Sequence, residues 1–196
     1  MTDEQLDVVG IGNALVDVLS HAEDDFLVKE DLVKGSMTLI EADRAESLYG
    51  AMGPGVEMSG GSAGNTMAGL ASLGSKGGYI GKVRDDQLGR VFSHDLKAMG
   101  LEFSTKMEAE DGEPTGRCLI LVTPDAERTM NTYLGAATML TPDDIDEDQI
   151  ARAKVIYMEG YLWDRPGAKE AFRKAARVAH DAGQKVSLSL SDSFCV

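Results

Sequence analysis

The sequence Ser59-Gly60-Gly61-Ser62-Ala63-Gly64-Asn65 runs directly into a helical pattern over residues 66–73. Glycines at the entrance of a helix let the backbone approach a ligand closely, because no Cβ atom stands in the way. The free amides of the first helical turn and the positive end of the helix dipole favour ligand oxygens. Asn65 adds a donor and an acceptor, which suits a hydroxyl-rich ligand. A tight turn with a helix cap is the alternative interpretation of these residues.

Length and composition place the chain among ordinary globular proteins. Its 196 residues are enough for one domain with a sizeable core, and 43% hydrophobic and 27% charged residues argue against disorder. The net charge of −14 argues against nucleic acid and anionic membranes as general partners. It does not argue against a phosphate ligand, which amides and a few cations hold locally.

The cysteines and the N-terminal residues indicate where the protein is located, and the histidines and acidic residues bear on metal binding. No window approaches the roughly 20 apolar residues of a membrane-spanning helix, and the acidic start Met-Thr-Asp-Glu-Gln is not typical of a signal peptide. Cys118 and Cys195 form no disulfide framework, so we expect a protein of the reducing cytoplasm. The histidines are scattered, and the acidic run Asp143–Asp148 is interpreted as a solvated helical turn rather than a cation site. The sequence therefore predicts no metal ligands in this chain.

Short apolar strands alternate with helices along most of the chain, which predicts a parallel sheet covered by helices. Three helices are expected to end at Gly74, Gly100 and Gly183, because glycine adopts the left-handed conformation that closes a helix. A further helix is expected to start at Pro142. The predicted strands span residues 6–12, 36–40, 78–83, 155–158 and 186–190, and the other predicted helices span 41–52, 65–73, 87–99 and 168–182.

The segment 101–134 differs, because two strand-like runs follow each other with no helix between them. These runs, Gly116–Val122 and Arg128–Leu134, are joined by the polar turn Pro124–Glu127. We therefore expect a hairpin that leaves the parallel sheet and forms a small β-sheet beside the core.

Two polar residues follow the first predicted strand. Gly10-Ile11-Gly12 lacks the third glycine and the following helix of a dinucleotide-binding fingerprint. Asn13 and Asp17 lie just past the carboxyl end of this strand, where open α/β sheets bind ligands. On one face of a short strand, Asp17 can accept hydrogen bonds from two hydroxyls of a sugar-like ligand. A turn-capping Asn13 and a surface Asp17 are the alternative.

Four segments together resemble one known family. Residues 59–89, SGGSAGNTMAGLASLGSKGGYIGKVRDDQLG, look like the N-terminal signature of the ribokinase-like (PfkB) family of carbohydrate and nucleoside kinases. Residues 8–19, VVGIGNALVDVL, resemble the first strand and ligand loop of that family, especially its adenosine kinase branch. Residues 114–137, PTGRCLILVTPDAERTMNTYLGAA, are similar to its lid strands, and residues 155–163, VIYMEGYLW, to the core strand behind the acceptor pocket.

The resemblance implies a ribokinase-like α/β fold with a three-layer α/β/α core and a small β-sheet lid. It assigns residues 1–13, 59–102 and 138–196 to the core, and residues 14–58 and 103–137 to the lid. It also implies that ATP, with Mg²⁺, phosphorylates a primary hydroxyl of a sugar or nucleoside.

By matching position, the resemblance also implies a set of acceptor-binding residues. These are Asn13 and Asp17 at the hydroxyls, Gly60, Gly61 and Asn65 beside the ring, Met37 and Tyr161 as lining, Arg128 toward the phosphate, and Glu159 facing the acceptor. For Glu159, a surface acid at the end of a strand is the alternative.

Met67, Arg84 and Ser189 depart from the family pattern, in positions that bear on helix packing and phosphate contact. The family's Gly-Ala-Gly-Asp core, which supplies an anion hole and the aspartate base, does not occur in the sequence. We therefore expect the acceptor-binding half of a kinase, C-terminally incomplete, without catalytic residues of its own and inactive alone. A non-catalytic sugar- or nucleoside-binding module or partner subunit is the alternative, and a homodimer through the lid is expected from its exposed edges.

Overall fold

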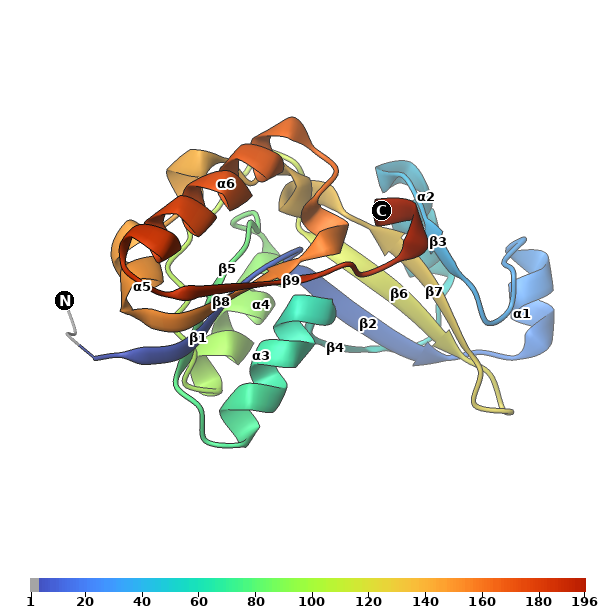
Figure 1. The fold of residues 1–196 in the computed structure, drawn as a ribbon. Helices are drawn as coiled ribbons and strands as arrows, with labels where there is room; N and C mark the ends of the chain where they lie inside the picture. The colour runs from blue at the N-terminus through green and yellow to red at the C-terminus, as the bar shows by residue number, and fades with distance from the viewer. Residues whose placement is uncertain (1–3) are drawn as a thin grey trace.

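The computed structural model describes residues 4–196, whose strands form two sheets (Figure 1). The first sheet has four parallel strands in the order β5 (Gly77–Ile80), β1 (Leu6–Ile11), β8 (Ala153–Glu159) and β9 (Lys185–Ser189). Because these strands run in parallel, the carboxyl ends of β1 and β8 meet at one edge of the sheet. That edge carries Asn13 and Glu159.

Helices cover both faces of the parallel sheet (Figure 1). On one face lie α3 (Ser62–Ser72) and α4 (Gln87–Ala98), and on the other lie α5 (Glu147–Arg152) and α6 (Pro166–Asp181). Successive residues of β1 point to opposite faces, so Val9 belongs to the apolar cluster that includes Phe172 of α6, whereas Val8 packs against the cluster that includes Phe92 of α4. The predicted three-layer α/β/α core is confirmed.

The second sheet has five strands in the order β3 (Met37–Leu39), β7 (Arg128–Tyr133), β6 (Gly116–Val122), β2 (Leu15–His21) and β4 (Val56–Gly60). Strands β6 and β7 pair antiparallel around the turn, so the predicted hairpin and the small sheet beside the core are confirmed. One face is buried, because Val16, Val18 and Leu119 pack with Leu48 of α2 (Ala42–Ala51). The other face carries Asp17 and turns toward the edge of the parallel sheet. We call this five-stranded sheet the lid sheet.

Several element boundaries differ from the predictions. Helix α3 begins at Ser62, before the predicted start, because Gly61 has a φ of +79° and is the N-cap. Strand β4, which pairs antiparallel with β2, is missing from the predictions, although Val56 to Ser59 alternate apolar and polar residues. Pro142 starts only the short 3₁₀ helix η2 (Pro142–Asp144), and α5 follows from Glu147.

Other local predictions are confirmed. Gly74, Gly100 and Gly183 have positive φ angles directly after α3, α4 and α6. The remaining elements are α1 (Asp24–Lys29) and the 3₁₀ helices η1 (Gly135–Met139), η3 (Gly160–Leu162) and η4 (Ser193–Cys195). Within residues 4–196, no helix has the length and apolar character needed to cross a membrane. The division of the chain into core and lid segments stays a prediction.

Candidate functional site

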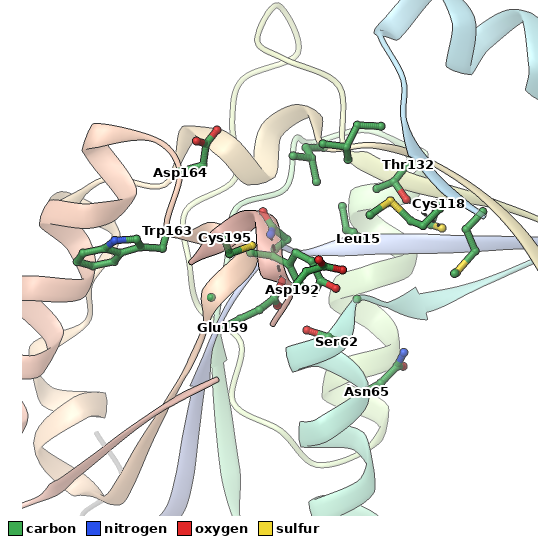
Figure 2. A pocket seen from close by; sticks show the side chains of 18 of the residues that line it. Leu15, Ser62, Asn65, Cys118, Thr132, Glu159, Trp163, Asp164, Asp192 and Cys195 are labelled. Carbon is green, nitrogen blue, oxygen red and sulfur yellow. Dashed lines mark hydrogen bonds between the residues drawn. The ribbon is translucent and has the colours of Figure 1, made fainter. Parts of the chain in front are cut away.

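A cavity of about 950 Å³ lies between the edge of the parallel sheet and the open face of the lid sheet (Figure 2). Of the nine residues singled out in the sequence, all but Gly60 line it. They come from both sheets, from α3 and η3, and from the turns before β2 and α3, and are Asn13, Asp17, Met37, Gly61, Asn65, Arg128, Glu159 and Tyr161. The fold therefore brings residues that are up to 148 positions apart in the chain (Asn13 to Tyr161) to one place.

Glu159 joins three segments of the chain at the bottom of this cavity. Its side chain is 1% exposed, so the alternative of a surface acid is wrong. Asn13 Nδ2 donates to Glu159 Oε1 at 3.1 Å, and the Ala63 N–H at the start of α3 donates to Oε2 at 3.2 Å. Burial raises the pKa of Glu159, and the hydrogen bonds from Asn13, Ala63 and Ser62 act in the opposite direction.

Asn13 is also buried, at 2% exposure, and it is held on both sides. Its side chain faces Glu159, and its carbonyl accepts a hydrogen bond from the Tyr79 hydroxyl at 3.1 Å. Its Oδ1 atom is buried without a hydrogen-bond partner among the described residues. Buried polar atoms normally have a partner, so this oxygen marks a place where a ligand donor fits.

Asp17 lies on β2 and points from the lid sheet into the cavity. Burial raises the pKa of its carboxyl to about 6, against the opposing effect of the Arg128 guanidinium. A partly buried carboxylate gains hydrogen bonds when ligand hydroxyls replace the water it has lost. Gly60 does not line the cavity; a Cβ atom at Gly60 would lie 2.2 Å from Cγ of Asp17. Gly60 therefore makes room for the Asp17 carboxyl.

The first turn of α3 is less free than the sequence suggested. The Ala63 N–H is already bonded to Glu159, and the Asn65 N–H donates to the Gly61 carbonyl within the helix. The exposed Asn65 side chain and Ser62 still line the cavity (Figure 2). The prediction that this turn offers free amides to a ligand is therefore wrong for Ala63 and Asn65.

Sequence reasoning missed the apolar wall of the cavity, which comes mainly from β6 and β7. Cys118 and Ile120 of β6 face Met130 and Thr132 of β7 as paired residues. The Thr132 hydroxyl donates to Cys118 Sγ at 3.3 Å, and burial raises the pKa of this thiol to about 11. Figure 2 shows Thr132 and Cys118 across the cavity from Glu159. Alternate residues of a strand share one face, so the sequence shows which residues of β6 and β7 lie together. It does not show which of the two faces turns toward the cavity.

The 3₁₀ helix η3 and the residues after it close another side of the cavity. Tyr161 lies there, and its N–H donates to Ser191 Oγ at 3.1 Å. Trp163 follows, with Lys169 and Arg173 of α6 over its ring at 5.9 and 5.5 Å from the centroid. The Trp163 ring also packs against Phe172 at 5.8 Å between centroids and points away from the centre of the cavity (Figure 2), so it supports this side rather than facing a ligand.

No group of three or more histidine, cysteine or acidic side chains that could hold a metal ion occurs among residues 4–196. In the acidic run, Asp144 pairs with the buried Lys82 at 2.5 Å and accepts from the Thr141 N–H at 2.9 Å. The Asp144 side chain is only 6% exposed, so the expectation of a solvated turn is wrong for this residue, which has a structural role. Asp143, Asp146, Glu147 and Asp148 are exposed, as that expectation requires.

Comparisons with known proteins agree with this architecture. The pfkB family of carbohydrate kinases matches residues 31–195. Over 129 residues, the chain is 36% identical to 5-dehydro-2-deoxygluconokinase of Clostridium perfringens. This match covers 65% of this chain and 38% of that protein. Over 191 residues, it is 27% identical to the protein of that name from Halalkalibacterium halodurans. That match covers 96% of this chain and 51% of the relative.

Solved structures are similar over almost the whole chain. A crystal structure of adenosine kinase from Sinorhizobium meliloti has 56% identity and a TM-score of 0.88, and covers 98% of this chain and 58% of that one. A probable sugar kinase from Rhizobium etli has 52% identity and a TM-score of 0.89, with the same coverage. The chain thus spans about half of these relatives' lengths. Its fold is ribokinase-like, and the chain belongs to the pfkB family of carbohydrate kinases.

Proposed function

We propose that the complete gene product is an ATP-dependent phosphotransferase that acts on a primary hydroxyl of a sugar or nucleoside. In this proposal residues 4–196 form the acceptor-binding half, and the catalytic base is not among them. The observation that carries the proposal is the cavity in which Asp17, Asn13 and Asn65 converge opposite an apolar wall. Hydroxyl-accepting groups opposite an apolar wall suit a sugar ring that carries an apolar substituent.

Each polar residue has a task in this proposal. The Asp17 carboxylate accepts hydrogen bonds from two neighbouring hydroxyls and so fixes the ring. Asn13 and Asn65 bind further hydroxyls, while Met37 and Tyr161 cover the ring and its substituent. Arg128, at the start of β7 on the cavity rim, stabilises negative charge on the phosphate that is transferred. Holding the acceptor in one orientation is a large part of phosphoryl-transfer catalysis.

The phosphate donor is proposed from the family rather than from side chains of this chain. ATP with Mg²⁺ would supply the phosphoryl group and neutralise its charge. No cluster of three candidate metal ligands occurs among residues 4–196, so in this proposal the phosphates of ATP are the main ligands of the Mg²⁺ ion.

The test is ATP-dependent phosphorylation by the complete gene product, with ADP release measured for adenosine, ribose and 5-dehydro-2-deoxygluconate. Turnover of about 1 per second or more with one of these acceptors is the expected result. Asp17→Ala should weaken binding of that acceptor by about 10- to 100-fold, because charge-assisted hydrogen bonds are lost. The 196-residue chain alone should bind the acceptor without turnover.

Two results would contradict the proposal. Ordinary turnover by residues 1–196 alone would show that the catalytic groups lie within them. Binding without turnover by the complete gene product would favour a non-catalytic binding module or partner subunit.

We further propose a homodimer through the lid sheet. Its edge strands β3 and β4 carry the exposed residues Leu39, at 52%, and Val56, at 58%. Unpaired strand edges with apolar side chains favour association with a second sheet. Sedimentation analysis with and without Val56→Lys would test this, since the charge should shift a dimer toward the monomer. A cytoplasmic location stays a prediction.

A further inference from the structure

The side-chain amide of Asn13 has one orientation that satisfies its neighbour. A carboxylate only accepts hydrogen bonds, so an amide next to it must turn its Nδ2 toward it. Asn13 Nδ2 lies 3.1 Å from Glu159 Oε1, which is this orientation. The other amide atom, Oδ1, must then face away from Glu159, and it is the one left without a partner.

Glu159 is itself held in place, so it can impose this orientation. Its second oxygen accepts from the Ala63 N–H at 3.2 Å, and a backbone N–H cannot turn into an acceptor. Gly12 leaves the space for this carboxyl, because a Cβ atom there would lie 2.2 Å from Oε2. The Ala63 N–H of α3 thus holds the Glu159 carboxyl in the space that Gly12 leaves, and Glu159 in turn orients the Asn13 amide.

We infer that Glu159 is a positioning residue that locks the Asn13 amide so that Asn13 offers only its Oδ1 acceptor to a bound ligand. A ligand must then place a hydrogen-bond donor, such as a hydroxyl, against Asn13. A ring nitrogen or ether oxygen without hydrogen is excluded from that position, because it would leave two acceptors facing each other. The inference rests on the proposed acceptor site. It adds that one hydroxyl of the acceptor is selected through Glu159, without contact between that hydroxyl and Glu159.

Substitutions at Glu159 and Asn13 can reverse, and then restore, which atom of residue 13 (an acceptor or a donor) faces the ligand. In Glu159→Gln, the oxygen of the new amide accepts from Ala63 and its nitrogen faces Asn13. The Asn13 amide must then turn round, and it offers Nδ2, a donor, to the ligand. In Asn13→Asp with Glu159→Gln, the new amide donates to the new carboxylate, whose second oxygen is again an acceptor. Asn13→Asp alone places two carboxylates at hydrogen-bond distance, which destabilises the fold.

The experiment measures by calorimetry the binding of adenosine and ribose, and of analogues of each in which the 2- or 3-hydroxyl is replaced by hydrogen (deoxy) or by fluorine (fluoro). A hydroxyl both donates and accepts, whereas fluorine only accepts, so the fluoro forms report which atom the Asn13 amide offers. It uses the complete gene product as wild type, Glu159→Gln, Asn13→Asp and the double variant. Glu102→Gln is the matched control, because Glu102 pairs with Arg152 at 2.6 Å and does not line the cavity.

We expect the wild type to bind one deoxy form about tenfold more weakly than its parent compound, which is the effect of one lost hydrogen bond with an unpaired partner. The wild type should bind the fluoro form at that position no better than the deoxy form, because Oδ1 and fluorine are both acceptors. Glu159→Gln should still bind the parent compound, whose hydroxyl can accept from Nδ2, but it should bind the fluoro form at least about threefold more tightly than the deoxy form. Discrimination at the other hydroxyl should persist. The double variant should lose the preference for the fluoro form, and Glu102→Gln should behave as the wild type.

Thermal denaturation without ligand gives an independent result. The melting temperature should fall in Asn13→Asp and rise again when Glu159→Gln is added. A double variant that melts no higher than Asn13→Asp, or a Glu159→Gln variant that discriminates like the wild type, would overturn the inference. If the wild type binds none of these compounds, the proposed function fails, while the melting temperatures still decide whether Glu159 locks Asn13.

Discussion

Acidification should weaken acceptor binding through Asp17, and the size of the effect follows from its surroundings. Burial raises the pKa of Asp17 from 3.8 to about 6. Only the ionised carboxylate can accept a hydrogen bond from each of two hydroxyls through both oxygens. Below pH 6 the protein is increasingly in the protonated form, which must lose its proton before it binds in this way.

The magnitude can be worked out from that pKa. If the ligand binds only to ionised Asp17, the dissociation constant is multiplied by one plus the ratio of protonated to ionised carboxyl. With a pKa of about 6, the affinity should be about 11-fold weaker at pH 5 than at pH 8, and almost constant above pH 7. Raising the pKa from 3.8 to about 6 also corresponds to a cost of about 3 kcal/mol for ionisation in the ligand-free fold.

The same raised pKa of Asp17 affects the stability of the fold in the opposite direction: acidification weakens binding but stabilises the fold. A stability measurement can therefore identify Asp17 as the titrating group. A carboxyl with a raised pKa in the folded state favours folding most at low pH, where it is protonated. This contribution is lost as the pH rises from 3.8 through about 6. Asp17 should therefore lower stability over the pH range in which it increases ligand affinity.

The assay is calorimetric titration of the complete gene product with its best acceptor between pH 5 and pH 8. Asp17→Asn is the control, since an amide of similar size cannot ionise. It should bind more weakly at pH 8 and lose most of the pH dependence. An affinity of the wild type that is constant over this range, or an equal pH dependence in Asp17→Asn, would refute the reasoning.

Three further outcomes are expected in thermal or urea denaturation of the complete gene product. Gly12→Ala should cost about 1–3 kcal/mol, because its Cβ atom would lie 2.2 Å from Glu159 Oε2 in a packed core; no loss would show that Glu159 can move aside. Gly69→Ala in α3 should instead stabilise by about 0.5–1 kcal/mol, since nothing lies within 4 Å of its Cβ position, and a loss there would contradict the helical assignment. Lys82→Met should cost about 3–5 kcal/mol, because Asp144 would remain as a buried unpaired charge, and recovery in Lys82→Met with Asp144→Leu is the check.

The sequence predicts the fold well where local signals and the final packing agree. Strand β6 has the predicted bounds, Gly116–Val122, because a run of apolar residues ends at a polar turn. Helix α4 starts at the predicted Gln87, after Asp86, whose side chain accepts from the Gly89 N–H. Strand β4 has a local signal, the alternation of Val56 to Ser59, but it is only five residues long between glycines, and its pairing with β2 cannot be read from the sequence.

The candidate site was predicted in its polar residues but not in its geometry. Asn13 and Asp17 could be expected at the cavity, because they follow the strand whose carboxyl end forms its edge. Asn13 is fixed by Glu159, which is 146 residues away in the sequence, and this contact depends on the parallel pairing of β1 with β8. The apolar residues of β6 and β7 depend likewise on which face of the lid sheet turns inward.

The glycines of the site have a second role beside the one that their sequence suggests, which stays a prediction. Glycines next to a helix start indicate close approach of the backbone to a ligand. In this structure the missing side chains mainly leave space for the protein's own polar groups. A Cβ atom would meet Glu159 at Gly12, Asp17 at Gly60, and the Asn13 carbonyl, at 2.7 Å, at Gly61. A larger residue at Gly12 or Gly60 should therefore alter binding by displacing the carboxyl of Glu159 or Asp17, whereas Gly61 lines the cavity itself.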